Sequence, residues 1–562
     1  MWTPLVVSTT LVALGPSLVA ATSGHFADLV ARSQLVGRDA ELLASYDYVI
    51  VGGGTTGLTV ADRLTENASI KVLVIEAGDL DAGEDEILIP RYALGAPAKY
   101  WYNLPSVPQV GLNNRSTVLQ AGKIVGGGSA VNGMFMPRGA QADYDIWRDL
   151  GNTGWGWSDL LPYFIKSETF TPPSAQLAAQ FNITYDMRYH GTSGPVQSSY
   201  PPFLYPAVSE RFNNLDLMCH MIMPLATPLV VTGPLTHSIL SPEPGPTPGQ
   251  LTTTLSSHER TCIYLPAPLS PKSTLMESPQ LASRLVSQFA SGRDQPVQSV
   301  KAAKEVILAA GAPHTPQILQ ISGVGPKKLL TSLGINVISD LPGVGANFHD
   351  HPFFQTDGTV ANDLNPSPAN NTNTTWMAEQ LELYRSRHEG VYTTSLGNAA
   401  AFLPLNEITS LSNNIVNQFN QQNPQNYFPS GVDSTIIAGF KAQREVLAKY
   451  IKQGKVAMGE FIGGTGAGMV LVLLKPLSRG SITIKSTSAF DDPVVDFATM
   501  RNPLDLAILT EMVRAWRKLL LTPALQTMGP TATSPSANIT SDADIQAFLK
   551  DNLQSSLWHP SG

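Results

Sequence analysis

Apolar residues near the N-terminus fall into short runs that predict a β-α-β unit. Residues 46–51 are aromatic or β-branched apart from one aspartate and end at glycine, which is typical of a buried strand. Residues 55–65 carry apolar side chains at helical spacing, and residues 71–75 form a second apolar run. A strand, a helix and a strand in this order predict parallel strands joined by a crossover. We therefore expect a parallel sheet of the α/β class here.

Later apolar runs predict more of this sheet and then a second region. Residues 305–310 resemble another strand, followed by a helix from about residue 315. The stretch 362–375 is rich in Asn, Pro, Ser and Thr, which predicts a domain boundary. Beyond it, two strands of a second sheet and one amphipathic helix are expected. These three elements are residues 470–475, 481–486 and 504–520.

Two segments show no sustained period. Residues 90–154 are rich in Gly, Pro, Asn and aromatic residues, which favours loops wrapped around a ligand over independent elements. Residues 217–285 contain many prolines and few charges, which is unfavourable for a sheet. The regular structure is therefore expected on either side of these segments.

Composition excludes several classes of function. A chain of 562 residues is long enough for more than one core. The net charge of −8 argues against a nucleic-acid partner, which requires clustered Lys and Arg. The chain has only two cysteines, Cys219 and Cys262, so we expect neither a disulfide framework nor a cysteine-based metal site.

The N-terminus predicts secretion. Residues 1–21 resemble a signal peptide, followed by a polar leader at 22–44. The apolar run contains Gly15 and Pro16 and is short for a bilayer, so no stable membrane span is expected. Six N-x-S/T triplets agree with an extracellular glycoprotein. They lie at Asn67, Asn114, Asn182, Asn370, Asn373 and Asn538.

A dinucleotide-binding fingerprint follows the first strand. Gly52 suits a tight turn, Gly54 lets the backbone approach a diphosphate, and Gly57 allows close packing of helix on sheet. Glu76 ends the next strand, where its carboxylate would accept hydrogen bonds from ribose hydroxyls. This pattern leaves FAD and NAD as alternatives. The residues expected at the dinucleotide are Gly52, Gly54, Thr55, Thr56, Gly57, Glu76 and Ala77.

Four further segments resemble the glucose–methanol–choline (GMC) oxidoreductases. They are the glycine-dense 122–139, the segment 311–326, the stretch 341–352 with the sequence LPGVGANFHDHP, and 479–481. The resemblance implies FAD and a glycine loop that covers the flavin ring. Trp101 is either a flavin contact or ordinary core. The residues implied at the ring end are Trp101, Ser129, Asn132, Gly133, Met134 and Phe135.

The resemblance also implies the architecture and the reaction. It implies a Rossmann-like FAD-binding domain at 45–361 and a substrate-binding domain built on an antiparallel sheet at 362–562. Similar proteins are fungal aryl-alcohol oxidases and dehydrogenases of secondary metabolism, which oxidise the CH–OH group of an alcohol. His559 matches the family's base, which takes the hydroxyl proton while hydride moves to flavin N5. The electron acceptor would be oxygen or a quinone.

Two departures from the family pattern lead to an alternative interpretation of the protein's function. Family members continue for some tens of residues beyond His559, so we expect a C-terminally truncated module with weak or absent activity. Residues 217–285 lack family-like strands, and one hypothesis is that this segment is read out of frame. The alternative is therefore an inactive remnant with impaired FAD binding. An NAD-dependent dehydrogenase is disfavoured by the glycine loop at 126–133.

Overall fold

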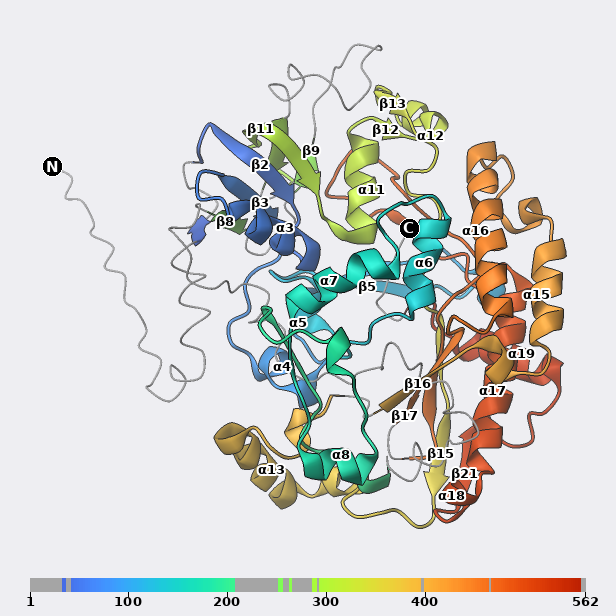
Figure 1. The fold of residues 1–562 in the computed structure, drawn as a ribbon. Helices are drawn as coiled ribbons and strands as arrows, with labels where there is room; N and C mark the ends of the chain where they lie inside the picture. Colours follow the sequence, from blue (N-terminus) through green and yellow to red (C-terminus); the bar gives the residue numbers. More distant parts are fainter. Residues whose placement is uncertain are drawn as a thin grey trace.

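Two sheets organise the part of the chain that the computed structural model describes (Figure 1). One has seven strands and is mostly parallel, and the other has four antiparallel strands. In Figure 1 the larger sheet lies at upper left and the smaller one toward lower right. The described residues are 33–36, 42–207, 251–255, 262–264, 286–290, 293–395, 399–463 and 466–556.

The larger sheet has the strand order β1-β8-β3-β2-β11-β10-β9. From β1 to β11 the neighbours are parallel, and β10 and β9 continue the sheet in antiparallel pairs. The predicted α/β sheet is confirmed. Its elements are β1 (Ser33–Val36), β2 (Ser45–Val51), α3 (Thr55–Thr65), β3 (Val72–Glu76), β8 (Leu251–Leu255), β9 (Cys262–Tyr264), β10 (Val286–Ala290), β11 (Gln298–Leu308) and α11 (Gly311–Ile321).

Helices pack on both faces of this sheet. Successive strand residues point to opposite faces, so Val49 and Ile50 on β2 enter different layers. Ile50 packs with Leu58 of α3, and Val49 packs with Ile318 of α11. Both strand residues are fully buried, which explains why β2 is a continuous apolar run rather than an alternating one.

Two short strands correct the expectation for residues 217–285. β8 inserts between β1 and β3 along its whole length, and β9 pairs with β10. The prediction that this segment is unfavourable for a sheet is therefore wrong for these stretches. The β8 sequence Leu-Thr-Thr-Thr-Leu is rich in β-branched residues, which suit a pleated strand. Most of the segment, and with it the out-of-frame hypothesis, lies outside the described residues.

The smaller sheet has the order β14-β18-β17-β16 and packs against α17. Trp516 of α17 is fully buried, and its indole Nε1 donates to the carbonyl of Ala467 at 2.9 Å. The predicted helix at 504–520 and the strand near 470 are confirmed. Figure 1 shows four helices to the right of this sheet, α15, α16, α17 and α19. The bounds are β14 (Phe353–Gln355), β16 (Ala399–Leu403), β17 (Gly459–Gly463), β18 (Met469–Leu473), α15 (Ser412–Gln421), α16 (Ser434–Lys452), α17 (Pro503–Leu520) and α19 (Asp542–Asn552).

The predicted strand at 481–486 does not join this second sheet. It is shorter, β19 (Ser481–Thr483), and forms a separate ribbon with β20 (Val494–Asp496). Gln320 of α11 explains the placement, because its side chain donates to the carbonyl of Ile482 and accepts from the backbone N–H of Ile484. These buried bonds hold the ribbon beside the helix of the first region.

Residues 90–154 contain more regular structure than expected. β4 (Trp101–Pro105) and β5 (Val118–Gly122) form an antiparallel ribbon, and α6 (Gln141–Asp149) follows. The expectation of loops alone is wrong, because the aromatic and β-branched residues of this segment pair into strands. Leu104 and Leu119 face each other across the ribbon and are buried, which anchors it.

Short elements complete the described chain. No helix among the described residues is long and apolar enough to cross a membrane. Asn373 caps the helix α13 (Thr374–Arg387), with its side chain accepting from two backbone N–H groups. The remaining elements are α4 (Asp85–Leu88), α5 (Gly128–Val131), α7 (Trp157–Ser167), β6 (Glu168–Thr171), α8 (Ala175–Phe181), β7 (Val196–Ser199), β12 (Val324–Gly325), α12 (Lys327–Ser332), β13 (Ser339–Asp340), β15 (Asp357–Val360), α13 (Thr374–Arg387), α14 (Leu405–Ile408), α18 (Pro523–Gln526) and β21 (Pro530–Ser534).

Asp505 in the first turn of α17 predicts a large effect on stability. Its buried carboxyl accepts from the backbone N–H of Leu477 at 2.6 Å, and from the backbone N–H and hydroxyl of Ser478 at 2.9 and 2.6 Å. Asp505→Ala would strand these donors, so we expect the free energy of unfolding to fall by about 2–4 kcal/mol. Denaturant unfolding measures this. The exposed first-turn control Asp544→Ala should cost less than about 1 kcal/mol, and equal losses would contradict the argument.

Candidate active site

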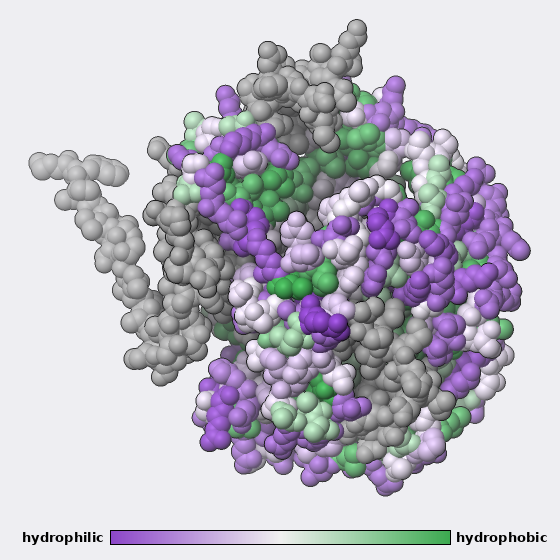
Figure 2. Space-filling model, viewed as in Figure 1, coloured by the Kyte–Doolittle hydropathy of each residue, from purple (hydrophilic) through white to green (hydrophobic). Residues whose placement is uncertain are grey.

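A cavity of about 980 Å³ lies between the two sheets. One wall is formed by the carboxyl ends of β2, β3 and β11, the glycine loop after β5 and the start of α11. The other wall is formed by the four-stranded sheet. Ligands of open parallel sheets bind at the carboxyl ends of strands, so this is the expected place for a site. Figure 2 shows hydrophobic residues gathered where the larger sheet meets α11, beside a hollow in that face.

The turn from β2 into α3 forms a tight cradle without side chains. Gly52 has φ +107°, and a Cβ there would lie 2.3 Å from the carbonyl oxygen of Ala309. A Cβ on Gly57 would lie 1.9 Å from the carbonyl oxygen of Gly52. Neither position therefore accepts a side chain, as the fingerprint requires. Gly52 lines the cavity, whereas Gly57 lies behind it and packs the helix against the turn.

Gly54 differs from its neighbours because it has room for a side chain in the protein itself. Its backbone is extended, with φ −79° and ψ −172°, and an added Cβ would meet only the Cα of Gly127 at 3.8 Å. Gly54 lines the cavity together with Thr55 and Thr56. The first backbone N–H groups of α3 have no partner within the helix, so they are available to an anion. The space left by Gly54 thus belongs to the cavity.

Glu76 at the end of β3 is tied to the same turn. Its Oε2 accepts from the backbone N–H of Gly53 at 2.6 Å, and its Oε1 accepts from that of Gly78 at 2.7 Å. Burial raises the pKa of this carboxyl, and the backbone donors oppose that shift. Each oxygen still has a lone pair for a ligand hydroxyl. Glu76 and Ala77 both line the cavity, as the sequence predicts for a ribose contact.

The glycine-dense loop packs directly against the β2-α3 turn. The backbone N–H of Gly126 donates to the carbonyl of Gly53 at 2.8 Å, and the Thr55 hydroxyl donates to the Gly126 carbonyl at 3.1 Å. A Cβ on Gly127, which has φ +55°, would lie 2.8 Å from the Cα of Gly54. Two motifs about 70 residues apart in the sequence therefore form one continuous wall.

The residues predicted to contact the flavin ring fall into two groups in the structure. Asn132, Gly133 and Phe135 line the cavity. Ser129 and Met134 do not: the Ser129 hydroxyl donates to the Gly126 carbonyl at 2.7 Å, and the Met134 side chain is buried. Met134 has φ +63°, and its backbone N–H donates to Asn132 Oδ1 at 2.8 Å. Ser129 and Met134 therefore stabilise the conformation of the loop without lining the cavity.

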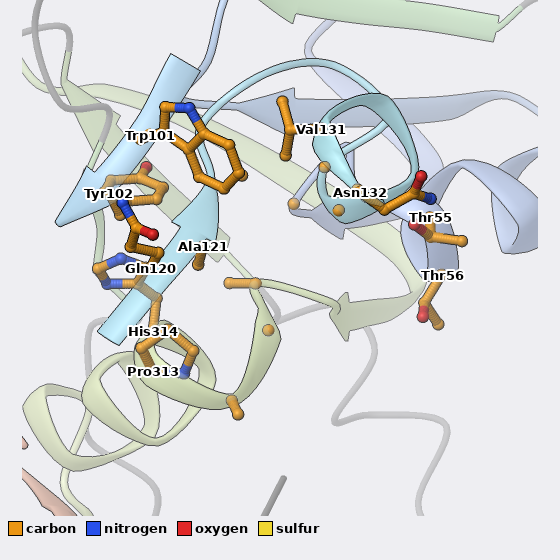
Figure 3. Close-up of a pocket in the computed structure, with 18 of the residues that line it drawn as sticks. Thr55, Thr56, Trp101, Tyr102, Gln120, Ala121, Val131, Asn132, Pro313 and His314 are labelled. Atoms are coloured by element: carbon orange, nitrogen blue, oxygen red, sulfur yellow. The ribbon is translucent and has the colours of Figure 1, made fainter. Parts of the chain in front are cut away.

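A second set of cavity residues comes from the β4-β5 ribbon and α11 (Figure 3). Trp101 lines the cavity with its indole N–H donating to the carbonyl of Ala96 at 3.0 Å. The Tyr102 and His314 rings lie 4.6 Å apart, and His314 Nδ1 is 2.9 Å from Gln317 Oε1. Figure 3 shows Trp101, Tyr102, Gln120 and His314 on one side of the cavity, and Thr55, Thr56 and Asn132 on the other. Sequence reasoning missed Tyr102, Gln120 and His314, although His314 lies in a family-like segment and Gln120 lies beside one.

Sequence reasoning also missed Glu460 on β17. This residue lines the cavity and is only 8% exposed. Burial raises the pKa of its carboxyl to about 7. The only signal in the sequence is one acidic residue inside the otherwise apolar strand Gly-Glu-Phe-Ile-Gly.

The raised pKa of Glu460 predicts a change in stability with pH. The folded protein keeps a proton that the unfolded chain releases near 4.5, so stability declines as the pH rises from 4.5 to about 7. Glu460→Gln cannot ionise, so its stability relative to wild type should increase over this window, by up to about 3 kcal/mol at pH 8. Unfolding at pH 4.5 and pH 8 measures the difference. The exposed control Glu445→Gln should show no such trend, and a flat response of Glu460→Gln would refute the prediction.

The predicted base, His559, lies outside the described residues. The described chain ends at Ser556, beside the cavity wall. Gln554 pairs with Phe353 through backbone bonds of 2.9 and 3.0 Å, and Phe353 lines the cavity. The Ser556 hydroxyl donates to the carboxyl of Asp350, the residue before a cavity-lining histidine. The last described residues therefore lie beside the cavity wall.

The described residues fit a dinucleotide. The cavity volume of about 980 Å³ lies at the upper end of the roughly 300–1,000 Å³ usual for ligand sites. The glycine wall offers backbone N–H groups without side chains, and Glu76 stands at the point where an acid binds ribose. Among the described residues no group of His, Cys, Asp or Glu could hold a metal ion.

Comparisons with known proteins agree with this geometry. Two models described as GMC oxidoreductase match the chain, one at residues 46–197 and 282–353 and the other at residues 476–562. A dehydrogenase of Emericella nidulans, xptC, is 36% identical over 92% of this chain and 83% of its own length.

Solved structures show the same fold. An FAD-dependent oxidoreductase from Chaetomium thermophilum has a TM-score of 0.81 and 35% identity, covering 92% of this chain and 89% of its own. A fungal aryl-alcohol oxidase has a TM-score of 0.78 and 29% identity, covering 92% and 90%. With the glycine cradle, the acid at the end of β3 and these matches together, the chain belongs to the GMC oxidoreductase family, with FAD as its cofactor.

Proposed function

We propose that this protein oxidises the CH–OH group of a largely apolar alcohol. The observation that carries the proposal is that one cavity joins the dinucleotide cradle to an apolar face of the four-stranded sheet. When bound, FAD would supply the hydride acceptor, flavin N5. The sheet face would hold the substrate and exclude water from it. Similarity to a dehydrogenase of Emericella nidulans and the resemblance to dehydrogenases of fungal secondary metabolism support a role there.

The cofactor contacts are proposed from the lining of the cavity. Gly52, Gly54 and the N-terminus of α3 would bind the diphosphate through backbone N–H groups, with Thr55 and Thr56 beside it. The ribose would lie at Glu76 and Ala77. Residues that would contact the ring end are Trp101, Asn132, Gly133 and Phe135. Gly57, Ser129 and Met134 would position these contacts rather than touch the cofactor.

His559 is the proposed base for the substrate hydroxyl. An extended chain spans about 3.5 Å per residue, so His559 lies no more than about 11 Å along the backbone from Ser556. That distance would allow the imidazole to reach the cavity. A neutral histidine accepts a proton near pH 7, which suits removal of the hydroxyl proton as hydride leaves the same carbon.

A visible spectrum and an anaerobic bleaching assay test the proposal. Purified protein should be yellow, and an excess of benzyl alcohol without oxygen should bleach the flavin. Adding oxygen or a quinone to the bleached protein then identifies the acceptor, because only a competent acceptor restores the colour rapidly. A yellow protein that no primary aryl or alkyl alcohol bleaches would refute alcohol oxidation.

The alternative, a non-catalytic remnant with impaired FAD binding, has one supporting observation. The family model leaves residues 198–281 unmatched between its two matched parts. A colourless protein that fails to take up added FAD would favour this alternative. Sequencing the messenger RNA across this segment tests the out-of-frame hypothesis separately.

We also propose that the protein is secreted and N-glycosylated. The support is the apolar N-terminal segment together with the exposure of five of the six candidate asparagines. A loss of mass on treatment with an N-glycosidase, for protein recovered from culture medium, tests both parts. The exposed positions are Asn67, Asn114, Asn182, Asn373 and Asn538.

A further inference from the structure

One face of the four-stranded sheet is turned toward the cavity. Residues directly opposite each other on paired strands project to the same face. Glu460 on β17 pairs with Phe402 on β16 and with Val472 on β18, and Val472 pairs with Phe353 on β14. Ile462, two residues along β17, projects to that face as well. Phe353, Phe402, Glu460 and Ile462 all line the cavity.

The opposite face of the same sheet is core. Phe354, Leu403, Phe461 and Leu471 alternate with the cavity-facing residues and pack in the cluster that contains α17. The sheet thus separates the hydrophobic core from the cavity. Glu460 is the one charged residue in its four strands, and it stands on the cavity side.

The Glu460 carboxyl has no protein partner among the described residues. Its pKa is raised by burial alone, without an ion pair or hydrogen bond that would oppose the shift. Burying a carboxyl without a partner is unfavourable, so such a group usually serves a ligand. Its neighbours on this face, Phe402, Val472 and Ile462, have apolar side chains that cannot hydrogen-bond to it. Because Glu460 lines the cavity, a ligand bound there could supply this partner.

We propose that Glu460 is a specificity-determining residue that hydrogen-bonds a second oxygen of a neutral, otherwise apolar alcohol. This inference rests on the proposed alcohol oxidation. A carboxylic acid both donates and accepts, so a phenolic or alcoholic hydroxyl can satisfy it completely. A neutral partner is favoured over an ammonium group, because the surrounding Phe and Ile side chains offer nothing to replace the hydration of a cation.

Paired probes that differ only at the second oxygen test the inference. The probes are the 2-, 3- and 4-hydroxybenzyl alcohols, each compared with the corresponding methylbenzyl alcohol. Calorimetric titration of the FAD-loaded protein, reduced with dithionite under anaerobic conditions, measures binding without turnover. In wild type, at least one hydroxyl isomer should bind about tenfold more tightly than its methyl partner.

Three variants assign that preference to the carboxyl. Glu460→Gln keeps a donor and an acceptor and should retain the preference to within about threefold. Glu460→Leu should abolish it, so that hydroxyl and methyl partners bind within about twofold of each other. The control Glu445→Leu, at an exposed position of α16 that does not line the cavity, should leave it unchanged. Flavin content confirms that each variant is folded.

The outcomes that would contradict this inference differ from those that would contradict the proposed function. A preference that survives in Glu460→Leu, or no preference in wild type, overturns the role of Glu460. Tighter binding of 4-(aminomethyl)benzyl alcohol than of every hydroxyl isomer overturns the choice of a neutral ligand. If benzyl alcohol bleaches the oxidised protein in these cases, the proposed function stands without this inference. If no alcohol bleaches it, both fail.

Discussion

Replacing His559 with asparagine is expected to slow alcohol-dependent bleaching of the bound flavin by about 10²–10⁴-fold. The loss follows from the proposed role, because without a base the substrate hydroxyl must lose its proton to water while hydride leaves. Anaerobic stopped-flow measurement of the bleaching rate at saturating benzyl alcohol reports on this step alone. Flavin content should not change, since the proposed role concerns the substrate and not cofactor binding.

The pH profile and a matched variant separate this role from a structural one. In wild type the rate should rise with increasing pH, in a single inflection, as the base loses its proton. That inflection should vanish in His559→Asn. His388→Asn is the control, because His388 is exposed at the end of α13 with φ +54°, a conformation that asparagine tolerates. An unchanged rate in His559→Asn would remove His559 from the mechanism.

Substitutions at Gly54 should weaken FAD binding in proportion to their size. An added methyl fits the protein, because it would meet only the Cα of Gly127 at 3.8 Å, but it would occupy the space proposed for the diphosphate. Intrusion into a filled site costs about 1–3 kcal/mol, so Gly54→Ala should raise the Kd for FAD by about 5- to 150-fold. Gly54→Val should raise it further. Flavin absorbance of the purified protein and titration of the apoprotein with FAD measure both effects.

The control for this series is a glycine with equal room elsewhere. Gly439 lies within α16, away from the cavity, and an added Cβ there would meet nothing within 4 Å. Gly439→Ala should bind FAD as wild type does and gain slightly in stability, because alanine favours a helix. Normal FAD affinity in Gly54→Val would show that the diphosphate lies elsewhere.

Local sequence patterns were sufficient to predict the wall of the cavity that the parallel sheet forms. The run at 46–51, the glycines from Gly52 to Gly57 and the acid Glu76 lie within about 30 residues, and each turn or strand is dictated by its own residues. Gly52 and Gly57 have no room for a side chain, so their spacing carries the geometry directly. The helix at 504–520 was predictable for the same reason, since its apolar stripe is contained within one segment.

The wall formed by the four-stranded sheet was not predictable, because its strands are far apart in the sequence. Phe353, Phe402 and Glu460 become neighbours only through the register of β14, β18, β17 and β16, and no local pattern encodes that register. Glu460 by itself resembles an ordinary strand residue on a solvated face. Only the structure shows that this face is turned to a cavity, where the Glu460 carboxyl can contact a ligand.

The two faces of the four-stranded sheet can be varied independently. A library that randomises positions 402, 460, 462 and 470 would alter the shape and polarity presented to the ligand. The intervening residues, which face α17, would stay as they are and keep the protein folded. A library selected for activity on new alcohols should therefore contain few unfolded variants. An equally large library on the α17 side would consist mostly of unfolded variants.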